Sequence, residues 1–145
     1  MSFLKIAIVV IRFSLGTLFV FGGVQKFVPK SPRQKTEVVQ QLPDHVIKIK
    51  AFIGGLKQTG YFWPMLGVVE ILCGILLVSQ YLALLGAIVL LPITINIFLF
   101  HLFLEPHEPG ELLLTALYLL ANVVIISYHY PKLKKTFLTF NSIYT

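Results

Sequence analysis

The fold class of this chain is decided by residues Trp63–Val78, WPMLGVVEILCGILLV. Apart from Glu70 the stretch has no charged residue, and an apolar run of this length is typical of a helix that crosses a lipid bilayer. A carboxylate inside such a helix is unfavourable unless another group pairs with it, so Glu70 is a candidate functional residue by position alone. Arg12 interrupts the first apolar segment of the chain. We therefore expect Arg12 and Glu70 to meet inside a bundle of helices.

The composition is that of a membrane protein. Hydrophobic residues make up 57% and charged residues 12% of the 145 residues, whereas a soluble domain has roughly 25% charged residues. A bilayer core is crossed by about 20 mostly apolar residues, and four segments qualify: 6–28, 62–79, 82–104 and 112–130. The sequence predicts one domain, residues 1–145, with an all-α, integral membrane four-helix bundle. Because Arg12 breaks the early apolar core, the first segment is expected to be a retained span and not a cleavable signal peptide.

The loop between the first two predicted spans contains a short amphipathic helix. From Asp44 to Leu56 apolar residues recur at helical spacing, with lysines between them. We expect this helix to lie at the membrane interface or across one end of the bundle. Only Gln80 and Tyr81 separate the second span from the third, which requires an antiparallel hairpin.

The formal net charge of +6 does not indicate a nucleic-acid-binding protein, because the basic residues lie at the borders of the predicted spans, where juxtamembrane anchors occur. These residues are Lys5, Lys26, Lys30, Arg33, Lys35, Lys132, Lys134 and Lys135. Both sides carry similar numbers of them, so charge gives no orientation. The lipid bilayer is thus the expected partner. Cys73 is the only cysteine, which excludes an intramolecular disulfide or dithiol couple and favours a packing role.

Each buried charge has glycines on its own helical face. The pairs are seven residues apart, Gly16 and Gly23 on the first span and Gly67 and Gly74 on the second. Because small residues allow membrane helices to approach closely, we expect these two faces to pack against each other or against the remaining spans.

A candidate ligand site follows from the depth of each polar residue, counted at about 1.5 Å per residue along the spans. Arg12, Glu70, Asn96 and Asn122 fall at levels that allow one polar core. His101 and Lys26 lie near the far border as a second, interfacial group. Several alternatives remain open. The charged pair can be a structural ion pair or a ligand-binding or proton-handling site. The asparagines can form interhelical hydrogen bonds that hold the helices together. Lys26 can be an interfacial anchor. His101 can face the head group of a substrate or bond to a backbone carbonyl.

The sequence offers little for haem, metal or catalytic chemistry. His101 and His129 lie about 20 Å apart by helical rise, too far for a bis-histidine haem within one subunit. The loop 105–111, with His107 and three glutamates, is expected to be a solvated acidic turn. We find no nucleophile with an evident base. We therefore assign no catalytic residue, no metal ligand and no cofactor bound covalently or by motif.

Three strings resemble the DoxX family: RFSLGTLFVFGGVQKF at 12–27, PMLGVVEILCGILLV at 64–78 and LPITINIFLFHLFLEP at 91–106. The shared features are the arginine, glycines and lysine of the first string and the glutamate and glycines of the second. The similarity covers nearly the whole chain, including the long first loop. The resemblance implies a small four-helix membrane protein. Named members are associated with quinone-linked redox systems, such as subunits of terminal quinol oxidase and thiosulfate:quinone oxidoreductase.

The leading functional hypothesis is an auxiliary subunit of a quinone-linked redox system in the inner membrane of a bacterium. It would bind a lipophilic small molecule such as a quinone through Arg12, Glu70, Asn96, His101 and Asn122, with Lys26 at the interface. Electrons would come from a redox partner protein, and the chain is not expected to be catalytic alone. A homo-oligomer also fits. The rival class is non-enzymatic: a membrane scaffold, or a transporter of small solutes or protons.

Overall fold

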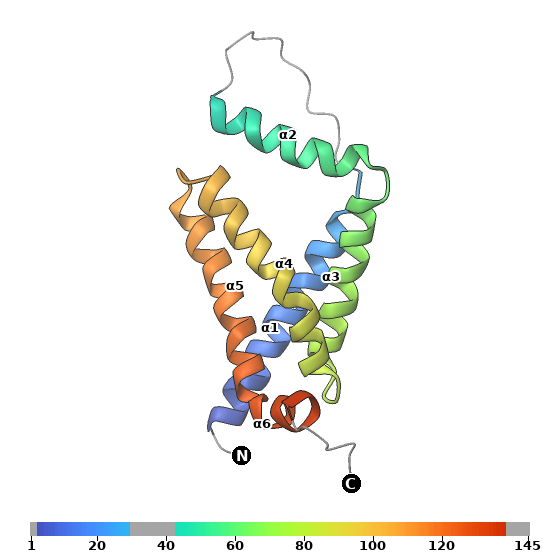
Figure 1. The fold of residues 1–145 in the computed structure, drawn as a ribbon, viewed down its shortest axis with the longest axis vertical. Coiled ribbons are helices and arrows are strands. Elements are labelled where there is room, and N and C mark those ends of the chain that lie inside the picture. Colours follow the sequence, from blue (N-terminus) through green and yellow to red (C-terminus); the bar gives the residue numbers. More distant parts are fainter. Residues whose placement is uncertain (1–2, 30–42, 139–145) are drawn as a thin grey trace.

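The computed structural model describes residues 3–29 and 43–138, which fold into a bundle of helices (Figure 1). Four helices run along the bundle: α1 (Phe3–Gln25), α3 (Phe62–Val78), α4 (Ala83–Leu104) and α5 (Pro109–Tyr128). At the top of Figure 1, α2 (Asp44–Gln58) lies across the end of the bundle. At the opposite end, α5 is followed by the short α6 (Tyr130–Leu133) and a π-helical turn, Lys134–Leu138. The described residues contain no strand.

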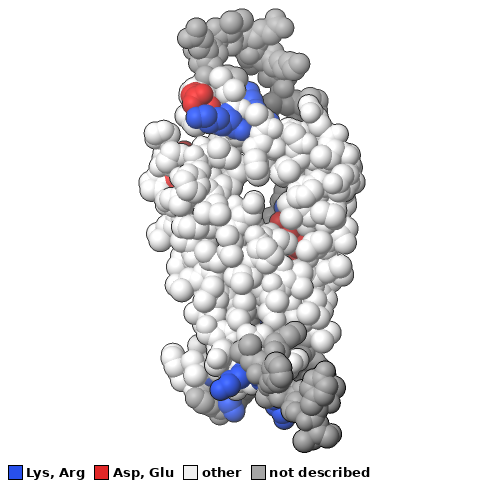
Figure 2. Space-filling view, in the orientation of Figure 1, with Lys and Arg blue, Asp and Glu red and all other residues white. Residues whose placement is uncertain are grey.

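Three of these helices, α1, α4 and α5, are each long and apolar enough to cross a membrane. The fourth, α3, passes that test together with α2, from which it is bent by 88°. The bundle thus has three to four candidate spans, and the predicted all-α membrane bundle is confirmed. The protein is a multi-pass membrane protein. Figure 2 shows the reason: lysine and arginine gather at the two ends, while the side between them is almost free of charge.

The α1–α3 contact depends on the predicted glycines. A Cβ atom added at Gly74 would lie 2.5 Å from the Gly16 carbonyl oxygen, and one added at Gly23 would lie 2.6 Å from the Gly67 carbonyl oxygen. No real side chain tolerates such contacts with backbone, so both glycine pairs mark sites where the two helices touch. The expectation that the two glycine faces pack together is confirmed. Cys73 is buried in the adjoining core, as expected of a packing residue.

The amphipathic helix is also confirmed, with α2 ending at Gln58, two residues beyond the predicted segment. None of its residues is buried, because it lies on the end of the bundle and only one face meets protein. Two ring contacts attach it: Phe52 packs on Phe100 with centroids 5.6 Å apart, and His45 packs on His107 at 5.2 Å. The short turn between α3 and α4 forms the expected antiparallel hairpin (Figure 1). Of the predicted basic anchors, Lys30, Arg33 and Lys35 lie outside the described residues.

Candidate functional site

Arg12 does not reach Glu70. Its Nε donates a hydrogen bond to the Leu77 carbonyl oxygen at 3.0 Å. Its Nη2 donates to the carbonyl oxygens of Ser79 at 2.6 Å and Val78 at 3.4 Å. The last carbonyls of a helix lack intrahelical donors and carry the negative end of the helix dipole. Arg12 therefore caps the C-terminal end of α3, and the predicted Arg12–Glu70 pair is wrong.

Glu70 pairs instead with Lys26, whose Nζ lies 2.5 Å from Glu70 Oε2. Side chains on a helix lean toward its N-terminus. On α1, this direction carries Arg12 away from Glu70 and brings Lys26 back toward it. The depth count failed because it set the ends of the two helices level, whereas α1 extends past the end of α3, so that Arg12 lies beside Val78. Lys26 follows the end of α1, yet its side chain is only 16% exposed and turns inward rather than anchoring in the interface.

The Lys26–Glu70 pair forms part of the wall of a cavity of about 160 Å³, which we call the Glu70 pocket. Its polar wall consists of Lys26, Glu70, Asn96 and His101. The remainder is apolar, with Phe52, Ile53 and Leu56 from α2 and Trp63, Leu66, Ile97 and Phe100 from α3 and α4. The pocket therefore lies where α2 crosses the bundle, and Figure 2 shows acidic atoms beside a hollow below that end. Four of the six predicted site residues come together here.

His101 contributes to this pocket from the last turn of α4. Its Nδ1 is 2.7 Å from Glu105 Oε2, one helical turn further on, and this contact is an ion pair when the imidazole is protonated. The contact lacks hydrogen-bond geometry, so Nδ1 has no hydrogen bond within the described part of the chain. Of the two alternatives for His101, a bond to a backbone carbonyl is not found among the described residues, and the ring lines a cavity instead.

The two asparagines occupy different environments. Asn96 is exposed at the Glu70 pocket. Asn122 is fully buried between α4 and α5, where its Nδ2 donates to Thr94 Oγ1 at 3.3 Å. Asn122 does not line the Glu70 pocket. The predicted polar core of four residues is therefore divided among three places: the cap at Arg12, the Glu70 pocket and the Asn122–Thr94 contact.

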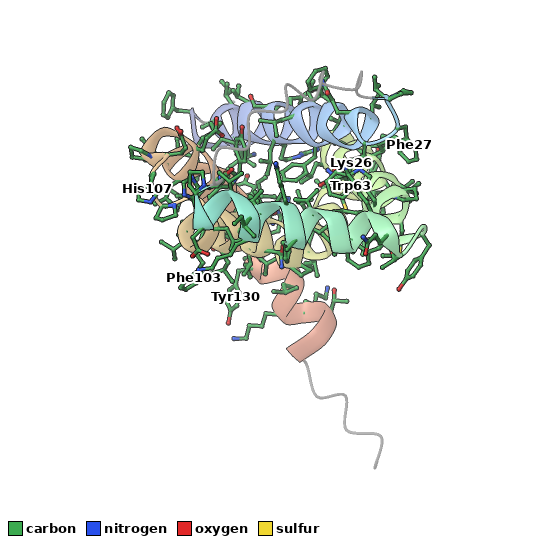
Figure 3. The ribbon with its side chains drawn as sticks, turned by 90° about the horizontal axis from the view of Figure 1, so that it is seen from above. Lys26, Phe27, Trp63, Phe103, His107 and Tyr130 are labelled. Atoms are coloured by element: carbon green, nitrogen blue, oxygen red, sulfur yellow. The ribbon has the colours of Figure 1, made fainter. Side chains whose placement is uncertain are left out.

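Two further residues of this region, Trp63 and Lys57, were not among the site residues predicted from the sequence. Trp63 lines the Glu70 pocket and stands at the start of α3. Both Lys26 and Lys57 approach its ring, with Nζ atoms 5.4 Å and 4.9 Å from the ring centroid. In the view from above, Lys26 and Trp63 lie next to each other between α1 and α2 (Figure 3). The available signal was a lone tryptophan at a span border, where membrane proteins place aromatic residues.

The acidic turn between α4 and α5 gathers no metal site. Within residues 3–29 and 43–138, no group of three or more histidine, cysteine, aspartate or glutamate side chains is arranged to hold a metal ion. His107 instead packs on the ring of His45.

The fold and the pocket together define a helical membrane bundle with an ion pair beneath a helix that lies across its end. The DoxX family model matches residues 7–102, well over half of the chain. The chain belongs to the DoxX family, which confirms the resemblance. The matched region includes all four polar residues of the Glu70 pocket. No match was found among curated proteins or among solved structures.

Proposed function

We propose that this protein is an auxiliary membrane subunit of a quinone-linked redox system and that it binds a quinone ring in the Glu70 pocket. The observation that carries the proposal is the convergence of Lys26, Glu70, Asn96 and His101 on a cavity with apolar walls. Small-molecule sites have this character, since a few polar groups orient a ligand that apolar surface holds. The family resemblance supplies the choice of quinone among lipophilic ligands.

The size of the pocket suits a single ring. A cavity of about 150 Å³ is large enough to bind benzene, and the Glu70 pocket measures about 160 Å³. An isoprenoid tail would need another path. A neighbouring groove of about 180 Å³ shares Phe52, Asn96 and Phe100 with the pocket and continues to Phe103, which is 73% exposed. This groove would let the tail leave along α4 toward lipid.

The wall residues have distinct tasks in this proposal. Within the described residues the Asn96 amide has no hydrogen-bond partner, so its N–H groups are free to donate to a ring carbonyl. The Lys26 ammonium lines the same pocket and would be a second donor. Glu70 holds or releases a proton at its carboxyl oxygen, and the apolar face of α2 excludes water. A bound quinone would supply two-electron, two-proton redox chemistry.

The proposal needs further partners and a particular membrane. Because no redox group is assigned to the chain, electrons would come from a redox partner protein, which can assemble with one copy or with a homo-oligomer. We place the system in the inner membrane of a bacterium, which the helical spans and the family resemblance support. Mass spectrometry of gently purified protein would identify copurified partners and lipids.

Trp63 provides a direct test, because it is the single tryptophan of the chain and lines the pocket. Purified protein in neutral detergent is titrated with a short-tailed benzoquinone, and Trp63 fluorescence is measured. We expect saturable quenching. Asn96→Leu removes one hydrogen bond worth about 0.5–1.5 kcal/mol and should weaken binding roughly two- to tenfold. Asn122→Leu is the matched control, and its binding should equal that of the parent.

Two results would overturn the proposal. One is quenching that never saturates, which means collision without a site. The other is equal affinity in the parent, Asn96→Leu and Glu70→Gln proteins, which removes the polar wall from binding. In either case the scaffold or transporter becomes the better description.

A further inference from the structure

A second cavity lies on the other side of Lys26 and Trp63. It measures about 410 Å³ and is lined by Gly22, Gln25, Lys26, Val28, Lys57 and Trp63. We call it the Lys57 cavity. It forms where the end of α1, the last turn of α2 and the start of α3 meet. We propose that the Lys57 cavity binds the phosphate of an acidic phospholipid head group.

The charges around this cavity favour an anion. Both Lys26 and Lys57 place their ammonium groups beside the Trp63 ring. Lys26 is paired with Glu70, but Lys57 has no ion-pair partner within residues 3–29 and 43–138. Among the residues that the structure describes, the lining of the cavity contains no acidic side chain. Two lysines and one carboxylate leave a net charge of +1 around the cavity, and this positive charge favours a bound phosphate.

The position of the cavity favours a lipid as the source of the phosphate. Tryptophan at the border of a membrane span lies at the level of lipid head groups, and lysines there attract acidic lipids. Trp63 lies in the first turn of α3, where the helix dipole adds positive potential. Gln25 offers a side-chain amide to the remaining phosphate or glycerol oxygens, while Val28 and the Trp63 ring provide apolar contact for the start of the acyl chains.

Lys57 lines the Lys57 cavity but not the Glu70 pocket, so a substitution there tests the lipid site while leaving the wall of the proposed quinone site intact. The protein is purified in neutral detergent and offered equal amounts of phosphatidylglycerol and phosphatidylcholine, and bound lipid is measured by native mass spectrometry. We expect the full-length parent to retain phosphatidylglycerol preferentially. Lys57→Gln should lower the fraction with bound phosphatidylglycerol by about fivefold. Lys50→Gln, which removes the same charge from an exposed position on the same helix, should leave it unchanged.

A competition arm separates the two sources of phosphate. Inorganic phosphate at the same concentration as the lipid should not displace phosphatidylglycerol, because it lacks the apolar contacts. Displacement would transfer the site to a free phosphate compound and overturn the lipid assignment. Equal retention by the Lys57→Gln and Lys50→Gln proteins, or no preference for phosphatidylglycerol over phosphatidylcholine, would overturn the site itself.

Discussion

Arg12 lies within α1 and Lys26 directly after its last residue, and the two side chains meet different environments along α3. Arg12 is satisfied by backbone carbonyl oxygens at the end of a helix. Lys26 is satisfied by one carboxylate beside a cavity. The Arg12 guanidinium is thus held by backbone oxygens alone, whereas the Lys26 ammonium is held by a side-chain carboxylate that also lines a cavity. The comparison teaches that a charge inside a membrane helix becomes a candidate for ligand binding when its partner also lines a cavity, and not when backbone carbonyl oxygens alone hold it.

We expect the largest loss of stability from a change in the glycine contact between α1 and α3, because the surroundings of both Arg12 and Lys26 depend on it. Gly74→Val would place a Cβ atom 2.5 Å from the Gly16 carbonyl oxygen and 2.7 Å from Val20 Cγ2. The helices must then separate, so the Arg12 cap and the Lys26–Glu70 pair are both lost. We expect no monodisperse peak in size-exclusion chromatography. Gly54→Val is the matched control, because nothing lies within 4 Å of a Cβ atom there. Parent-like elution of Gly74→Val would contradict the α1–α3 contact.

We expect the second-largest loss of stability from a change in the Lys26–Glu70 ion pair. Lys26→Met leaves the Glu70 carboxylate, 3% exposed, without its partner, and removal of one member of a buried pair destabilises by about 3–5 kcal/mol. The free energy of unfolding in mixed micelles measures this loss. The double variant Lys26→Met with Glu70→Leu should recover most of the stability, because an apolar pair replaces the ions. If the double variant is no more stable than Lys26→Met, the two side chains are not energetically coupled.

We expect substitution of Arg12 to lower the free energy of unfolding by less, and independently of any substitution at Glu70. Arg12→Met removes charge-assisted hydrogen bonds to carbonyl oxygens that already end a helix, at a loss of about 1.5–3 kcal/mol. Combined with Glu70→Leu, its effect should add within about 0.5 kcal/mol, as for sites without shared partners. The same unfolding measurement, arranged as a double-mutant cycle, provides the test. A larger coupling energy would restore the direct Arg12–Glu70 contact.

The smallest effect concerns Asn122, which lies outside both environments. Its Nδ2 gives one hydrogen bond to Thr94, while its Oδ1 has no hydrogen-bond partner among the described residues. Interhelical hydrogen bonds in membrane proteins average about 0.6 kcal/mol. We expect Asn122→Leu to lower the free energy of unfolding by less than about 1 kcal/mol. A loss as large as that of Lys26→Met would show that Asn122 belongs to a polar network.

The fold was predictable from sequence because its signals are local. Hydrophobic length gives the spans, helical period gives the amphipathic α2, and seven-residue spacing gives the glycine faces. The Arg12–Glu70 error arose because the offset of one helix along another is not a local property. The sequence held a usable signal all the same. Setting Gly16 against Gly74 and Gly23 against Gly67 places Arg12 near the end of α3, far from Glu70.

The Glu70 pocket and the Lys57 cavity could not be predicted from sequence patterns. They form because α2 turns by 88° relative to α3 and lies over the bundle, bringing Phe52 and Lys57 to residues of α1 and α4. Neither period nor composition specifies that turn. Asn96 and His101 were found as candidates because polar residues are rare in apolar helices, but their shared cavity could be seen only in three dimensions.

Lys26 lies in the walls of both the Glu70 pocket and the Lys57 cavity. One ammonium group thus lines both the cavity proposed to hold a lipid phosphate and the pocket proposed to hold a quinone ring. An anion bound in the Lys57 cavity would compete with Glu70 for the ammonium group of Lys26. If an anion in the Lys57 cavity changes the affinity of the Glu70 pocket for its ligand by some factor, that ligand changes the affinity of the Lys57 cavity for the anion by the same factor. The lipid composition around the protein would therefore influence the affinity of the Glu70 pocket for its ligand through a change of position of the Lys26 side chain, without movement of any helix.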